Sequence, residues 1–87
     1  MRELSQRWPP LAGDKLPQLT ARELIRALRR DGWHLERTRG SHQHFSHDYK
    51  PGIVTIPVHS GRDVPLLVVR SILKQANLTE EEFRNLL

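Results

Sequence analysis

The hydrophobic and polar positions of the chain follow first the period of a helix, then that of strands, then that of helices again. Thr20 and Glu23 have the spacing of a capping box, and an apolar stripe at helical spacing follows, formed by Ala21, Leu24, Ile25 and Leu28. Asp31-Gly32 ends this segment, because glycine suits the left-handed position after a helix. The pattern predicts an amphipathic helix of about three turns after Thr20.

Three short strand candidates come next. Residues 33–38 and 42–47 alternate, and residues 53–58 are rich in β-branched side chains. Asp48-Tyr49-Lys50-Pro51-Gly52 is a turn by composition. Successive side chains of a strand point to opposite faces, so His42 and His44 face solvent if Phe45 faces the core.

The connection between the first two strands decides which side chains lie opposite each other. A two-residue Arg39-Gly40 turn would pair Leu35 with His44 and mix apolar side chains with imidazoles. A three-residue connection over 39–41 separates the two kinds of side chain, so we expect this register. Its pairs are Leu35 with Phe45, Glu36 with His44, and Thr38 with His42.

Two more helices are predicted after the loop at 59–63. The first starts near Val64 or Pro65 and runs through Leu73 or Ala76, and Asn77 can end it. Its side chains available for the core are Leu66, Val69, Ile72 and Leu73. Thr79 caps a short terminal helix, in which the side chains that can pack are Phe83, Leu86 and Leu87.

This order predicts an α+β domain with a three-stranded antiparallel sheet over residues 19–87, preceded by an irregular arm over residues 1–18. A three-stranded sheet must bury one face to be stable. With both long helices on that face, the other face stays free and becomes the candidate working surface. The side chains expected on it are His34, Glu36, Thr38, His42 and His44.

Composition narrows the class of partner. The 87 residues carry a formal net charge of +4 and no cysteine. Residues 20–74 hold ten Lys/Arg and five Asp/Glu, so the basic charge belongs to the folded part. A basic surface fits a nucleic acid, an acidic protein partner or, in third place, an anionic membrane surface, and no apolar run is long enough to span a bilayer. We expect a cytoplasmic protein without disulfide bonds.

His42 is the candidate catalytic residue. An imidazole titrates near neutral pH and can take the proton of an RNA 2′-hydroxyl, which then attacks the adjacent phosphorus and leaves a 2′,3′-cyclic phosphate. Arg37, Arg39 and Lys50 are the cations expected to hold phosphates, and His44, placed across from Glu36, is a further phosphate binder. The plainer alternative is a solvated histidine without a role.

A metal site is not expected. Zinc needs three or four converging ligands, and only His42 and His44 have a spacing that suggests a pair. The predicted chemistry therefore uses no cofactor.

Ordered motifs across the chain resemble the HicA toxins, small mRNA interferases of bacterial and archaeal toxin–antitoxin systems. The match runs from about Lys15 to Leu86. Its segments are Lys15-Leu16-Pro17, Leu19-Thr20-Ala21-Arg22-Glu23-Leu24-Ile25-Arg26-Ala27-Leu28, Asp31-Gly32-Trp33, Arg39-Gly40-Ser41-His42, Val54-Thr55-Ile56-Pro57-Val58-His59 and Arg70-Ser71-Ile72-Leu73-Lys74-Gln75-Ala76. The chain departs from the family at Leu66-Leu67-Val68, where Pro-Gly-Thr is frequent.

The resemblance implies a double-stranded-RNA-binding-like fold, metal-independent cleavage of mRNA, and a HicB-type antitoxin that covers the site. The family's catalytic histidine lies in a Gly-Ser-His motif, which corresponds to His42, and Ser41 joins the residues expected to contact RNA. A non-catalytic RNA-binding module is the alternative function. An inactive family member kept for protein contacts is a third.

Overall fold

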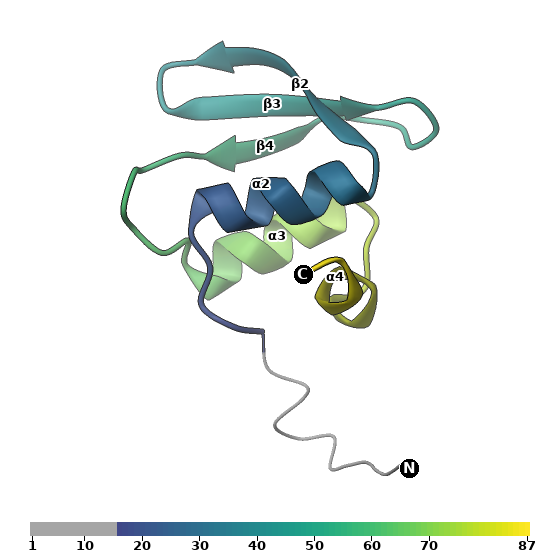
Figure 1. Cartoon of the computed structure of the whole chain (residues 1–87). Coiled ribbons are helices and arrows are strands. Elements are labelled where there is room, and N and C mark those ends of the chain that lie inside the picture. The colour runs from purple at the N-terminus through teal and green to yellow at the C-terminus, as the bar shows by residue number, and fades with distance from the viewer. Residues whose placement is uncertain (1–15) are drawn as a thin grey trace, which may run out of the picture.

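Three antiparallel strands form one sheet, and the two long helices lie together on one of its faces (Figure 1). The computed structural model describes residues 16–87, so most of the predicted 1–18 arm lies outside the described residues. The elements are α2 (Ala21–Arg30), β2 (Trp33–Arg39), β3 (His42–His47), β4 (Val54–Pro57), α3 (Leu66–Gln75) and α4 (Glu80–Leu86). The predicted α+β class and element order are confirmed.

Capping boxes begin two of the helices: the one at Thr20 is as predicted, and Thr79, predicted to cap the last helix, forms a second. Thr20 accepts a hydrogen bond from the Glu23 amide and donates its own amide to the Glu23 carboxylate, and Thr79 and Glu82 repeat the arrangement at α4. These bonds from the threonine backbone and hydroxyl lower the pKa of both glutamates. The ionised carboxylates therefore stabilise the helix starts above the ordinary carboxyl pKa, and this contribution is lost as the pH falls through the lowered values.

The β2–β3 register differs from the prediction. Leu35 does lie opposite Phe45, but the turn contains only Gly40 and Ser41, and a β-bulge at Glu36 absorbs the extra residue. The predicted pairs of Glu36 with His44 and Thr38 with His42 are therefore wrong. The observed pairs beyond the bulge are Arg37 with His44, Thr38 with Gln43, and Arg39 with His42.

The bulge reverses the alternation of β2. Directly opposed residues of antiparallel strands point to the same face, so Arg37 and Arg39 share the face of His44 and His42. Thr38 moves to the helix-covered face with Gln43. The uncovered face therefore holds two arginines where the sequence pattern predicted Thr38 and Glu36.

The core lies between the sheet and the helices. Trp33 and Phe45 come from the sheet, and Leu24, Ile72 and Phe83 from the three helices, all at most 1 % exposed. Two predicted core residues are wrong: Leu66 and Leu87 are 44 % and 46 % exposed. They lie at the start of α3 and beyond the end of α4, where few neighbours surround a side chain. No helix among residues 16–87 is long and apolar enough to cross a membrane.

Gly32 joins α2 to β2 in a conformation that only glycine adopts easily. Its φ is +105°, and an added Cβ would lie 2.6 Å from His47 Nε2. Gly52 has a similar φ of +83°, with no atom within 4 Å of an added Cβ. A side chain at either position would strain the backbone, but only at Gly32 would it also collide with a neighbouring residue.

We expect Gly32→Ala to lower the free energy of unfolding by about 2 kcal/mol or more, and clearly more than Gly52→Ala, because only the first adds a steric clash to the strain. Urea unfolding followed by tryptophan fluorescence measures both. Equal losses in the two variants would show that contact with His47 does not constrain Gly32.

Candidate functional site

The uncovered sheet face carries its polar side chains in two rows across the strands. At the end of the sheet near the Gly40–Ser41 turn, Arg39, His42 and Pro57 lie opposite one another. In the next row the three strands contribute Arg37, His44 and Thr55. The structure thus brings together four of the six predicted site residues, with Ser41 beside them in the turn.

His42 is the imidazole of this face that is free to react. It is exposed at the start of β3, and its ring forms no hydrogen bond with another residue of 16–87, whereas the rings of His34, His44 and His47 do. Arg39 lies directly opposite on β2. An exposed imidazole beside a guanidinium can take a proton from, or give one to, a ligand whose anionic group the guanidinium holds.

His44 is held in place by a neighbouring strand. Its Nδ1 lies 2.9 Å from the hydroxyl of Thr55 on β4, and the ring is partly buried. Arg37, and not Glu36 as predicted, lies opposite it on β2. The expected carboxylate neighbour is thus replaced by a cation, which strengthens the positive character of the face.

Lys50 does not belong to this cluster. Its ammonium group donates to the Asp31 carboxylate at 2.6 Å and to the Ala76 carbonyl at 3.1 Å, and so ties the C-terminal ends of α2 and α3 together. The β3–β4 connection that carries it leaves the sheet at the end opposite His42, about 17 Å away along β3. Lys50 therefore stabilises the helix layer, in contrast to the predicted role in phosphate binding.

His47 also has a structural position. Its Nε2 lies 2.6 Å from the Asp31 carbonyl, and its Nδ1 accepts from the amides of Tyr49 and Lys50. This bonding requires the hydrogen to be on Nε2. The ring also packs edge-on against Trp33, with centroids 5.1 Å apart. His47 thus fixes the turn after β3 and has no nitrogen left for chemistry.

The two remaining histidines lie apart from His42. His34 is exposed near the far end of the sheet, with its Nε2 3.3 Å from Asp48, and His59 is exposed in the loop after β4. Within residues 16–87, no three histidine or carboxylate side chains are grouped closely enough to hold a metal ion.

The family model described as the HicA toxin of bacterial toxin–antitoxin systems matches residues 21–78 of the 87. The chain belongs to the HicA toxin family. A search of curated proteins found no match.

Family membership makes this protein the toxin of a toxin–antitoxin system. The matched segment runs from the start of α2 through the end of α3 and contains the whole sheet. The exposed His42 and its arginine neighbours therefore lie inside the part of the chain that defines this HicA-family toxin.

We expect Lys50→Met to lower the free energy of unfolding by about 1–3 kcal/mol, because the partly buried Asp31 carboxylate and Ala76 carbonyl lose a charged donor. The matched control is Lys74→Met, which removes an exposed lysine of α3 and is expected to change stability by less than about 0.5 kcal/mol. Urea unfolding measures both. Unchanged stability in Lys50→Met, together with weaker RNA binding, would contradict this structural role and support the predicted role of Lys50 in phosphate binding.

Proposed function

We propose that this HicA-family toxin is a metal-independent endoribonuclease that cleaves mRNA in the cytoplasm with His42 as its acid/base residue. The observation that carries the proposal is the pairing of His42 with Arg39, and of His44 with Arg37, on the sheet face that the helices leave uncovered. The net charge of +4 supports a polyanionic substrate.

The reaction needs one proton removed and one supplied. His42 in its neutral form takes the proton of the 2′-hydroxyl while the 2′-oxygen attacks the adjacent phosphorus. The bond from phosphorus to the 5′-oxygen of the next nucleotide breaks, and that oxygen takes up a proton from solvent water, to which the protonated His42 then returns the proton that it accepted. The products are a 2′,3′-cyclic phosphate and a 5′-hydroxyl end. One well-placed imidazole contributes about 10²–10⁴-fold to such a step.

The two arginines stabilise the charge that develops on the phosphoryl oxygens. Arg39 lies opposite His42, and Arg37 follows two residues away on the same face of β2, so both guanidinium groups can reach a phosphate placed over His42. His44 and Ser41 border the same position and are proposed as substrate contacts. Because the site is an open face, a long single strand can lie across it without entering a cavity.

A HicB-type antitoxin is proposed as the protein that switches this activity off by covering the face. The support is membership of a toxin–antitoxin family together with the exposure of His42 and the two arginines in the isolated chain. A protein laid over this face would exclude RNA and bury the reactive imidazole.

We expect purified protein to cleave single-stranded RNA in the presence of EDTA, and His42→Ala to slow cleavage by about 10²–10⁴-fold. The matched control is His34→Ala, which removes another exposed histidine from the same face at the far end of the sheet, and should leave the rate within about twofold. Gel analysis of end-labelled RNA measures all three rates. Cleavage by His42→Ala at the wild-type rate would contradict the assignment, and salt-sensitive RNA binding without any cleavage would favour the non-catalytic RNA-binding module.

A further inference from the structure

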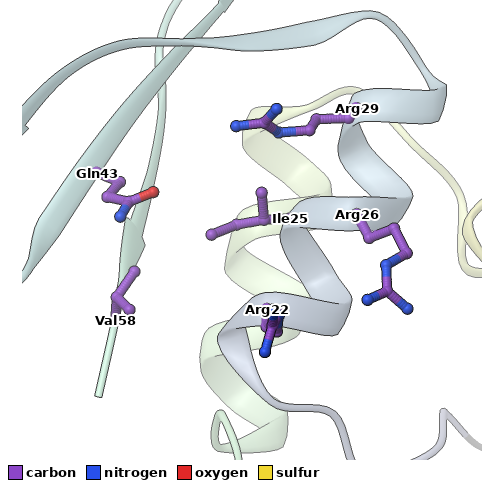
Figure 2. Close-up of a pocket in the computed structure, with 6 residues that line it drawn as sticks. All are labelled: Arg22, Ile25, Arg26, Arg29, Gln43 and Val58. Atoms are coloured by element: carbon purple, nitrogen blue, oxygen red, sulfur yellow. The ribbon is translucent and has the colours of Figure 1, made fainter. Parts of the chain in front are cut away.

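A groove of about 410 Å³ lies between α2 and the helix-facing side of the sheet, beside the end that carries His42 (Figure 2). Its volume is in the range of sites for small organic ligands. From the sheet side it is lined by Gln43 and Val58, and from α2 by Arg22, Ile25, Arg26 and Arg29. None of these arginines forms an ion pair within residues 16–87.

The α2 wall presents a cation, an apolar side chain and a second cation in sequence. Arg22, Ile25 and Arg29 are three and four positions apart, so they form one stripe along the helix. Figure 2 shows Ile25 and Arg29 extending toward the sheet, whereas Arg26 turns away from it. Arg29 therefore extends a guanidinium toward the sheet at one end of the groove, and Arg22 lines the groove about two helical turns away, with the apolar Ile25 between them.

The sheet wall adds one polar recognition group. Gln43, a partly buried residue, extends its side chain toward α2 (Figure 2), and its amide offers both a donor and an acceptor. Val58, also partly buried, lies beside it and continues the apolar floor. A planar, apolar ligand with a polar edge fits between these residues.

A nucleotide within an RNA strand has this same order of groups. Its base has apolar faces and a hydrogen-bonding edge, and a phosphate lies on either side of it. RNA is favoured over an acidic peptide because Gln43 follows His42 directly on β3, so the groove begins on the strand that carries the proposed catalytic residue. The sheet ends at this point, next to the Gly40–Ser41 turn and the end of β4 (Figure 1), so the groove and the uncovered face with His42 adjoin the same end of the sheet.

We propose, resting on the proposed ribonuclease function, that this groove binds one nucleotide of the RNA substrate next to the cleavage position. Arg22 and Arg29 bind its flanking phosphates, Ile25 and Val58 contact the base, and the Gln43 amide reads the base edge. The groove thus supplies affinity and sequence preference, while the opposite face supplies chemistry.

The test uses the full chain and fluorescein-labelled 2′-O-methyl RNA, which cannot be cleaved because it lacks the nucleophilic hydroxyl. Fluorescence anisotropy gives the Kd for short oligo-A, oligo-C, oligo-G and oligo-U probes. We expect Arg29→Ala to raise the Kd about tenfold and to reduce the salt slope by about 0.7, because one phosphate contact is lost. Lys74→Ala, which removes an exposed cation outside the groove, should change the Kd by less than about twofold.

Gln43→Met keeps the length of the side chain and removes its amide. We expect the Kd of the wild-type protein to differ among the four probes. The Kd values of this variant should lie within about threefold of one another, because the hydrogen bond that distinguishes the base edges is lost. Circular dichroism confirms that each variant is folded.

The outcomes separate this proposal from the ribonuclease proposal. If the protein cleaves ordinary RNA but Arg29→Ala and Gln43→Met bind the probes as the wild type does, the groove proposal is overturned and the ribonuclease stands. If cleavage is absent but both variants alter binding as expected, the groove is supported and the ribonuclease fails. If Arg29→Ala binds a polyglutamate peptide more weakly than the wild type does but binds the RNA probes equally well, the nucleotide-binding proposal is overturned in favour of an acidic protein partner.

Discussion

A single extra residue in β2 determines the chemistry of the uncovered sheet face. At the bulge, Leu35 and Arg37 pair with consecutive residues of β3, and Glu36 is left without a partner. Every side chain beyond Glu36 consequently points to the face opposite the one that simple alternation would give it. Without the bulge, Arg37 and Arg39 would lie toward the helices, and His42 would have no cation opposite it on β2.

The end of the sheet that carries His42 stays accessible because the side-chain hydrogen bonds that join the sheet to the helices lie at the other end. Asp31 accepts from Lys50 and from the Trp33 indole, and its carbonyl lies 2.6 Å from His47 Nε2. Lys50 also donates to the Ala76 carbonyl at the end of α3, so this network joins the ends of both long helices to the β3–β4 connection. At the opposite end, where His42 lies, no such network closes over the surface within residues 16–87. Two histidines of one strand thus have different roles because of their surroundings: His47 is fully bonded and His42 is free.

The parts of the structure that depend on local hydrogen bonds could be predicted from the sequence. The capping boxes at Thr20 and Thr79 define helix starts by their spacing alone, and the inward position of Phe45 follows from strand alternation. The bulge at Glu36 could not be predicted in this way, since no residue type marks it and it changes only the register. The positions of Lys50 and Gln43 could not be predicted from the sequence either, because they depend on which helix lies against each side chain in the folded chain.

The candidate site also combines features that can be predicted from local sequence with features that depend on the folded structure. His42 could be identified from its residue type and strand position, because an exposed imidazole is set by the same alternation that buries Phe45. The charge of Arg37 and Arg39 predicts that they bind phosphates, but their position beside His42 depends on the bulge. The family match over residues 21–78 covers both features, and it supports the toxin role without specifying how RNA is held.

The register of the β2–β3 hairpin is the most direct test of this view of the site, and backbone NOEs in an NMR spectrum of the labelled full chain measure it. We expect cross-strand contacts between Thr38 and Gln43 and between Arg37 and His44, with Glu36 outside the pairing. Contacts of Thr38 with His42 and of Glu36 with His44 would instead show an unbulged hairpin, with Arg37 and Arg39 turned toward the helices, and would contradict the proposed catalytic face.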